Sequence, residues 1–349
     1  VEKPINVGAR RFGFTRMRSW APIFIPLALG AAVGGWAAPP GNEPFWTRNE
    51  NPVSRLFGLP PGGDAAAGGD AGWQARMAVD VANTSFERIR GADELVLDFE
   101  TEAVGLELRR VWEGGWRAGV QVPVVSHQGG NTDDFIKEYH GWMGFAQGNR
   151  AWRPAGRLEG RHRRGGDTLF NLDGATTGVG DVRLFGAAPL AGGPAAPRAL
   201  DAVAGVKLPT GDPDRLLGSG SADFSLGLAA RDSASLARWN LEVHGGVGVL
   251  AMTEGEILGD RQNPFAGYGS FSLGWRLARW LVPRLQVDGH SPFFADTGFT
   301  PLDDWAAVLV TGATVFLPAD VALDIAVAED VAVNTAPDVV FHFSLKRRW

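Results

Sequence analysis

The sequence predicts an all-β protein, built as one antiparallel barrel of about twelve strands that spans a membrane. Three observations predict this fold. First, segments of about ten residues alternate between apolar and polar side chains, as strands do when one face meets lipid and the other meets water. Second, short and long connections between these segments alternate along the chain. Third, the final segment, 338–349, is a strand of the same kind and ends on an aromatic residue, Trp349.

The first residues have the composition of a secretory signal peptide. Several arginines precede an uncharged run from Trp20 to Trp36, and small residues at Gly35 and Ala37 mark a cleavage position after Ala37. A transmembrane anchor is the alternative, but the run is shorter than the roughly 20 apolar residues that a spanning helix needs. We therefore predict that residues 1–37 are a signal peptide and that the protein is exported.

The composition excludes several classes of protein. The 349 residues include no cysteine, so an exported chain of this size has to be stable without disulfides. With 13 tryptophans and 20 phenylalanines, the chain is too rich in aromatic residues for disorder. A net charge of −6 gives no reason to expect a nucleic-acid partner. No cofactor is expected.

Residues 38–72 are rich in proline, glycine and alanine, and their last part, from Asp64 to Gly72, is of low complexity. Two interpretations fit this composition. The segment is either a flexible periplasmic tail or a plug in the mouth of the barrel. Residues 73–349 are predicted to form the barrel itself.

Each strand is predicted from apolar residues at every second position, with glycine, serine or charged residues between them. The alternating apolar positions include, in chain order, Met77, Val79 and Val81; Val104, Leu106 and Leu108; Trp116, Val120, Val122 and Val124; Phe224, Leu226 and Leu228; Trp239, Leu241, Val243, Val247 and Val249; Phe271, Leu273, Trp275 and Leu277; Leu281, Leu285 and Val287; Val321, Leu323, Ile325 and Val327; and Val339, Phe341, Phe343 and Leu345. The predicted strands lie near 73–86, 94–112, 116–126, 177–190, 198–209, 221–231, 237–250, 267–278, 280–292, 304–316, 319–330 and 338–349.

An even number of strands returns the C-terminus to the periplasm, and the lengths of the connections agree with that topology. Short connections are predicted at 113–115, 191–197, 232–236, 279 and 317–318, and these are expected to be periplasmic turns. Longer ones are predicted at 87–93, 127–176, 210–220, 251–266, 293–303 and 331–337, and these are expected to be extracellular loops. Tryptophans near the strand ends are typical of the aromatic girdles at a membrane surface.

The polar positions of the strands predict the lining of the lumen. Charges of both signs share one face, so we expect ion pairs beside water, because an unpaired buried charge is too unfavourable. The predicted lining residues are Asp80, Glu107, Arg109, Arg117, Gln121, Asp181, Arg183, Asp201, Lys207, Asp223, Glu242, His244, Arg276, Arg284, Asp288, His290 and Asp324.

The longest loop, 127–176, contains a predicted small helix. Asp133 and Asp134 are suited to cap it, and apolar residues from Phe135 to Met143 share one face at three- and four-residue spacing. A basic stretch with six arginines follows, between Arg150 and Arg164. The loop either packs at the barrel mouth, with its arginines on lipopolysaccharide phosphates, or folds inward and sets the selectivity of a pore.

A hydrolytic centre is a third interpretation of the same loop. Ser126, His127, Asp133 (or Asp134) and His140 supply a nucleophile, a base and an orienting acid. Residue types alone are weak evidence for such a centre, because neighbours in sequence need not be neighbours in space. His127 and His140 have no metal-ligand spacing signature, so no metal site is predicted.

The C-terminal strand resembles the closing strand of bacterial outer-membrane barrels, in which the same pattern is the assembly signal. The residues that carry this resemblance are Phe341, Phe343, Leu345 and Trp349, whereas Arg347 departs from it. The resemblance implies an outer membrane of a Gram-negative bacterium as location. It also implies outer-membrane lipids, lipopolysaccharide and the barrel-assembly machinery as partners.

Further motifs resemble a particular family. They are the Gly-x-Gly-Asp of Gly178 to Asp181, the run from Lys207 to Asp212, the run from Gly218 to Asp223, Arg48 to Val53, Ser126 to Gly130, Asp288 to Pro292 and Glu329 to Asp338. Together they resemble the outer-membrane barrel family described as domain of unknown function 3187, and some are also similar to motifs of outer-membrane transporters. The resemblance implies fold and location, but no established activity and no functional residues.

The function predicted from these observations is a narrow channel or transporter for small solutes, hydrophobic or aromatic ones among them, and not an enzyme. One alternative is a lipid-acting hydrolase with its site in residues 126–140. The other is a plugged barrel with a structural or surface-binding role.

Overall fold

The computed structural model describes residues 42–62, 71–130, 132–143, 154–331 and 335–349. All of them belong to one compact unit, Gly35–Trp349. The predicted signal peptide and its cleavage position lie outside the described residues.

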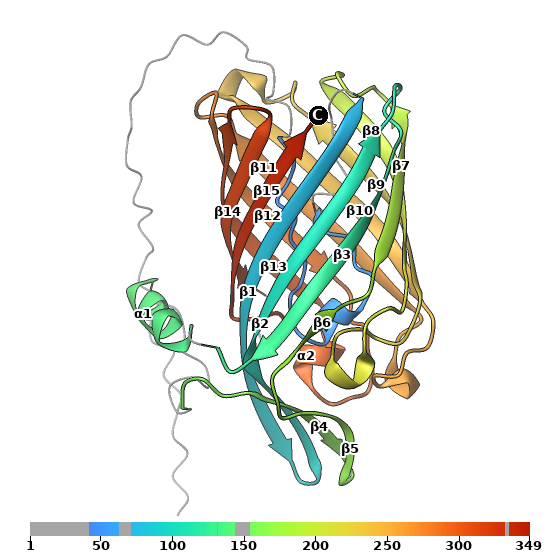
Figure 1. Ribbon diagram of the computed structural model, residues 1–349, viewed down its shortest axis with the longest axis vertical. Coiled ribbons are helices and arrows are strands. Elements are labelled where there is room, and N and C mark those ends of the chain that lie inside the picture. The colour runs from blue at the N-terminus through green and yellow to red at the C-terminus, as the bar shows by residue number, and fades with distance from the viewer. Residues whose placement is uncertain (1–41, 63–70, 131, 144–153, 332–334) are drawn as a thin grey trace, which may run out of the picture. The chain divides into compact units, whose positions relative to one another are not determined.

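Twelve antiparallel wall positions close into a barrel in the described part of the chain, because each strand pairs with the next and the last, β15, pairs back to β1 (Figure 1). This confirms the predicted fold class. The wall consists of β1 (Gly72–Arg90), β2 (Asp93–Val111), β3 (Arg117–Gln128), the pair β6 (Thr176–Val179) and β7 (Arg183–Ala191), β8 (Arg198–Lys207), β9 (Asp223–Asp232), β10 (Leu241–Met252), β11 (Phe265–Trp275), β12 (Leu281–His290), β13 (Ala306–Leu317), β14 (Val321–Asp330) and β15 (Val339–Arg348).

The register between neighbouring strands sends apolar side chains outward and polar ones inward. Met77 lies opposite Leu345 across the β1–β15 pair, and both are nearly half exposed. Asp80 lies opposite His342, and both are buried. A slip of one residue would exchange the two faces, so the alternation of the sequence fixes the register.

The outer face carries a belt of large apolar side chains. Its members include Met77, Leu106, Leu108, Leu184, Leu226, Leu228, Val247, Val249, Phe271, Leu285, Ile325 and Phe343, all more than a third exposed. Most exposed tryptophans lie at one end of the strands, among them Trp73, Trp112, Trp116, Trp239, Trp275, Trp280 and Trp349. An apolar surface of this extent, rimmed by aromatic residues, is the lipid-facing surface of a membrane barrel.

The two ends of the barrel differ in their connections. The short-turn end carries the C-terminus and the connections 112–116, 192–197, 233–240, 276–280 and 318–320. The long-loop end carries 129–175, 208–222, 253–264, 291–305 and 331–338. Short helical turns are η5 (Ala237–Trp239) at the short-turn end, and η4 (Pro213–Arg215), η6 (Gly259–Arg261) and α2 (Thr300–Asp303) at the long-loop end. No helix among the described residues is long and apolar enough to cross a membrane.

The prediction of a loop at residues 87–93 is wrong. β1 and β2 remain paired up to Arg90 and Asp93, and only a two-residue turn with Gly91 at positive φ joins them. The polar residues that suggested a loop are exposed on a hairpin that extends beyond the rest of the wall (Figure 1). β4 (Glu159–Arg164) pairs with this extension, and β5 (Asp167–Leu172) pairs with β4.

Helix α1 (Asp133–Met143) lies in the longest loop. The predicted strand 177–190 is interrupted, because residues 180–182 separate β6 from β7.

Residues 42–62 lie inside the barrel and are almost completely buried (Figure 1). This segment, which includes η1 (Ser54–Leu56), is called the plug below. Its later part joins an apolar cluster at the long-loop end, in which Phe57 contacts Phe293 and Phe294 with ring centroids 4.6 and 5.4 Å apart. The interior is therefore filled by a chain segment and not by wall side chains alone.

Candidate functional site: the plugged lumen

The start of the plug is bound by arginines near the short-turn end. The carboxylate of Glu43 accepts hydrogen bonds from the guanidinium groups of Arg76 (2.5 Å), Arg109 (2.5 Å) and Arg348 (2.8 Å). These arginines belong to β1, β2 and β15, which are neighbours in the wall. Charge-assisted bonds of this kind are about twice as strong as neutral ones.

The next part of the plug follows strand β12. Arg284 donates to Asn42 Oδ1 (2.5 Å). The Gln286 side chain bonds both backbone groups of Phe45, at 2.9 Å to the nitrogen and 3.1 Å to the oxygen. The side chain of Gln286 thus satisfies a backbone pair that would otherwise lack water or a sheet partner.

The same row continues toward the long-loop end. Thr47 Oγ1 donates to Asp288 (2.7 Å), and Asn49 Nδ2 lies 3.0 Å from His290 Nε2. His290 Nδ1 is 2.8 Å from Ser291 O, so Nδ1 carries the proton and Nε2 accepts from Asn49. Inward residues at every second position of β12 therefore hold successive positions of the plug.

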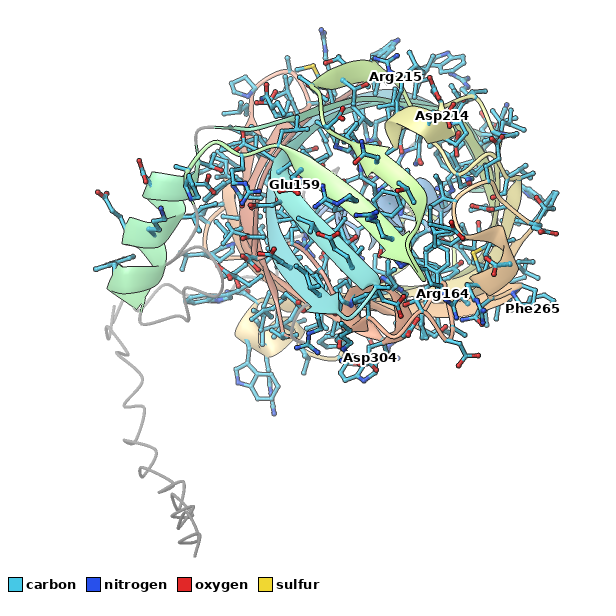
Figure 2. All side chains as sticks on the ribbon, turned by 90° about the horizontal axis from the view of Figure 1, so that it is seen from below. Glu159, Arg164, Asp214, Arg215, Phe265 and Asp304 are labelled. Carbon is cyan, nitrogen blue, oxygen red and sulfur yellow. The ribbon has the colours of Figure 1, made fainter. Side chains whose placement is uncertain are left out.

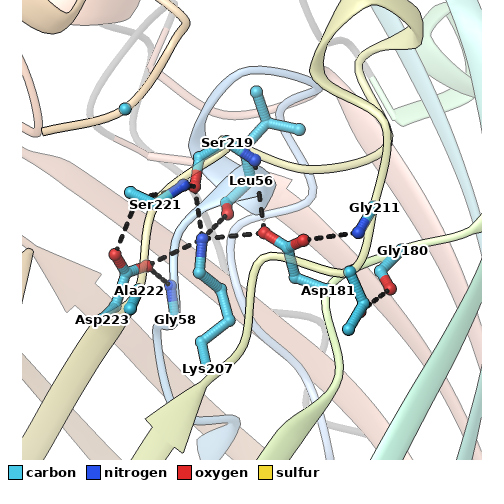
Figure 3. A network of polar contacts seen from close by, with 12 residues as sticks. Leu56, Gly58, Gly180, Asp181, Lys207, Gly211, Ser219, Ser221, Ala222 and Asp223 are labelled. Carbon is cyan, nitrogen blue, oxygen red and sulfur yellow. Dashed lines mark hydrogen bonds and ion pairs between the residues drawn. The ribbon is translucent and has the colours of Figure 1, made fainter. Parts of the chain in front are cut away.

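A buried ammonium group holds the middle of the plug (Figure 3). Lys207 Nζ donates to Leu56 O (2.8 Å) and to Asp181 Oδ2 (2.8 Å), and it lies 3.1 Å from Asp223 Oδ2. Asp223 also accepts from the backbone nitrogen of Gly58 at 2.6 Å. Lys207 and Asp223 thus hold both ends of a short stretch of plug backbone, and Asp181 binds the lysine.

The interruption between β6 and β7 makes this arrangement possible. Pro123 of β3 has no N–H, and its carbonyl accepts from Gly180 N at 2.8 Å. Val182 N then bonds Thr210 Oγ1 (2.9 Å) instead of β3. Asp181, between them, accepts from the backbone of Gly211 and from Lys207. Three of the motifs that resembled a family in the sequence, Gly178 to Asp181, Lys207 to Asp212 and Gly218 to Asp223, are thus brought together beside the plug.

The structure places the other predicted lining residues on the inner face, with their side chains buried. Several bond one another: Arg117 donates to Asp201 (2.9 Å), Gln121 to Glu107 (2.9 Å) and Arg183 to Gln121 (3.1 Å).

Sequence reasoning missed Glu43, Arg76, Gln286, His342 and Arg348 as interior residues. The wall residues among them share the period of their predicted neighbours, so that signal was available. Glu43 lies outside any strand and gave no signal.

Two cavities flank the plug. One has a volume of about 60 Å³ and lies between the plug and strands β1–β3, β7 and β8, with Trp46, Arg55 and Lys207 among its lining residues. The other has a volume of about 40 Å³ and lies between the plug and the wall from β8 to β13, where Tyr268 and Asp288 line it. Each cavity has room for a few water molecules beside the plug.

A lid of two hairpins covers the long-loop end, where β4 lies across the mouth between Glu159 and Arg164 (Figure 2). The ring of His162 is buried between Phe170 and Phe299, with centroids 5.9 and 5.4 Å away. Neither ring nitrogen has a hydrogen-bond partner within the described residues. Burial lowers the pKa of His162 to about 4, so the ring is neutral at pH 7.

The candidate hydrolytic centre is not formed. Ser126 Oγ bonds Thr177 Oγ1 (2.9 Å), whereas His127 points inward and bonds Thr101 Oγ1 (2.9 Å) and Leu216 O (3.0 Å). As consecutive residues of β3, Ser126 and His127 lie on opposite faces of the wall and cannot act as nucleophile and base.

The two remaining members of the proposed centre do not complete it. Asp133 accepts from Asn83 (3.0 Å) and from the backbone of Gly156 (2.8 Å). The side chain of His140 lies outside the described residues.

An apolar outer belt, a charged interior and a plug that fills it define a plugged transmembrane β-barrel. The chain belongs to the family described as "Protein of unknown function (DUF3187)", whose model matches residues 28–349. Among curated proteins, none matches the sequence.

A solved outer-membrane channel shares this fold. The structure is similar to the COG4313 outer membrane channel of Pseudomonas putida F1, with a TM-score of 0.54 and 13% identity over 83% of this chain and 100% of that one. It is also similar to two toluene transporters, each with a TM-score of 0.39. They are TodX of Pseudomonas putida (11% identity, 87% of this chain and 98% of that chain) and TbuX of Ralstonia pickettii (10% identity, 86% and 98%).

Proposed function

We propose that the protein is an outer-membrane channel for small solutes, which the plug closes in this structure and opens by leaving the lumen. The main support for this proposal is that a segment of the chain outside the wall fills the lumen. Small eight-stranded barrels are filled by their own side chains, but a twelve-stranded wall encloses more space. Here residues 42–62 occupy that space and are held to the wall by non-covalent contacts alone, so their departure would leave a polar passage.

The proposed location rests on the lipid-facing belt and on the topology. The short-turn end, with the C-terminus, faces the periplasm, and the lid faces the exterior, where lipopolysaccharide is the neighbouring lipid. Phe341, Phe343, Leu345 and Trp349 serve as the assembly signal in this proposal, because they lie on the outer face or at the end of β15, within reach of the assembly machinery. Replacing Phe343 and Trp349 with alanine is expected to lower the amount of barrel in the outer membrane, whereas replacing Trp142 of α1 is not.

Bilayer conductance tests the channel. Wild-type protein is expected to give few or small current steps, and a variant in which a Gly-Ser segment of equal length replaces residues 42–62 is expected to give large, frequent ones. Because the replacement has the same length, the comparison separates the loss of the plug's contacts from a shortening of the chain. A folded variant that remains electrically silent and solute-tight would contradict the proposal and favour a structural role for the barrel.

A plugged barrel with a structural or surface-binding role is the second candidate. The lid favours it, because the β1–β2 hairpin contacts the opposite loop through Arg90, whose side chain donates to Gly298 O at 2.8 Å. A mouth closed by such contacts would present a continuous external surface. The same conductance measurement separates the two candidates.

A further inference from the structure

The groups around Glu43 form a complete binding site for a carboxylate. Arg76, Arg109 and Arg348, called the arginine site below, direct three guanidinium groups from adjacent strands at two carboxylate oxygens. The side chains of Glu43, Arg76 and Arg109 are at most 1% exposed, and that of Arg348 is 17% exposed. A planar guanidinium matches the geometry of a carboxylate, so the site recognises this group in particular.

The positive charge around Glu43 comes from more than the three arginines. Lys346 contributes a fourth positive charge to the surroundings of Glu43. Two wall acids also contact these cations: Glu107 lies 3.7 Å from Arg109, and Asp324 lies 3.5 Å from Lys346. Glu43 therefore lies among four wall cations, and three of them bind its carboxylate directly at 2.5–2.8 Å. The wall therefore holds positive charge whose partner comes from the plug.

The other glutamate of the described plug behaves differently. Glu50 pairs with Arg48 (3.2 Å) and Arg55 (2.9 Å), which belong to the plug itself. If the plug leaves the lumen, Glu50 can keep both partners. The partners of Glu43 stay behind in the wall and face the open passage.

We propose that the arginine site binds the carboxylate group of a small solute that the channel carries, and that Glu43 occupies the site in the closed state as an internal substitute. This inference rests on the proposed channel function and names its substrate class. A solute carboxylate that displaces Glu43 frees the start of the plug, so solute binding and opening are linked by competition for one site.

Titration calorimetry with sodium propionate tests the site without requiring any conductance. Glu43→Ala removes the internal carboxylate and leaves a space that matches the carboxyl end of propionate. The matched control is Glu50→Ala, which removes a buried plug carboxylate that pairs with Arg48 and Arg55 of the plug itself. We expect Glu43→Ala to bind propionate at least about tenfold more tightly than wild type and Glu50→Ala. Adding Arg348→Gln to Glu43→Ala is expected to reverse that gain.

The propionate affinities of the three proteins decide whether the site binds a carboxylate. Equal propionate affinity in folded Glu43→Ala, Glu50→Ala and wild type would overturn the proposal, and heat-modifiable gel mobility reports whether each barrel is folded. Parallel titrations of the same proteins use sodium chloride and sodium phosphate. Binding of all three anions with equal affinity would reveal a general anion cluster and would also overturn a carboxylate site.

Conductance separates this proposal from the channel function. In a conducting Glu43→Ala barrel, millimolar propionate is expected to reduce the chloride current, because both anions use the arginine site. If propionate binds to Glu43→Ala but neither this variant nor the plug replacement conducts, the site stands and the channel function fails. If the plug replacement conducts and Glu43→Ala binds no propionate, the channel stands and the carboxylate site fails.

Discussion

At the scale of single residues, Lys207 shows how the barrel holds its plug. Its side chain and that of Asp223 are at most 3% exposed, and both groups bond the plug backbone as well as each other. A buried ion pair contributes little net stability compared with apolar packing, but removing one partner leaves the other charge unsatisfied. The pair therefore makes the position of the plug specific.

Lys207→Met is expected to destabilise the barrel by about 3–5 kcal/mol, because Asp181 and Asp223 lose their cation while they remain buried. The free energy of unfolding in denaturant measures this loss, and bilayer current is expected to rise because the plug is held less firmly. Arg198→Met is the control. Arg198 pairs with Asp232 at 3.2 Å on an exposed site, so its loss is expected to change stability by less than about 1 kcal/mol. Equal effects of the two substitutions would contradict this account.

Gly105 faces inward from β2, where a Cβ would lie 2.4 Å from the ring of Trp46. Gly105→Ala is therefore expected to displace Trp46 and raise the accessibility of the plug to proteases. Gly267→Ala in β11 is the matched control, since a Cβ there meets nothing within 4 Å. Identical cleavage of both variants would show that Trp46 moves without loosening the plug.

At the scale of elements, the lid contains a titratable group in an apolar setting. His162 is packed between phenylalanines, near Arg164, Asp93 and Asp303. Its pKa in the closed lid, about 4, is below the ordinary value of 6.5. The open lid therefore binds more protons between these values, and the stability of the closed lid falls as pH falls through that window.

Hydrogen–deuterium exchange in β4 and β5 is expected to become faster at pH 5 than at pH 7.5, after correction for the intrinsic rates. His162→Phe is expected to remove this difference, because phenylalanine fills the space between Phe170 and Phe299 without a titratable group. Exchange in β13 serves as the internal reference. A pH dependence that persists in His162→Phe would assign the effect to other groups of the lid.

The strands could be predicted from the sequence, whereas a tail and a plug both remained open for residues 38–72, and the contacts of the plug could not be predicted. Lipid outside and polar groups inside impose a period of two, so the limits of most strands were predicted to within a few residues. The part of β1 and β2 that extends beyond the wall lies outside that environment. Its polar residues therefore predict a loop, although they form a hairpin. Plug contacts join distant positions, such as Phe45 and Gln286, which are 241 residues apart. No local pattern reports such a pairing.

At the scale of the whole molecule, the outer belt determines where the barrel is stable. Val247, near the middle of β10, is 64% exposed on this belt. Val247→Arg is expected to lower the free energy of unfolding in phospholipid vesicles by about 2–4 kcal/mol, the range for a charge at the bilayer midplane. Leu190→Arg, close to the short-turn end of β7, is expected to lower it by about 0–1 kcal/mol. Similar losses at both positions would contradict a membrane depth centred on the belt.

The row of contacts along β12 has a mechanical consequence. Residues 42, 45, 47 and 49 bind residues 284, 286, 288 and 290 in the same order, so both segments run in one direction. A tension applied along the barrel axis loads these bonds together, in shear, and meets high resistance. Peeling that begins at residue 42 ruptures them one after another and needs little force at each step.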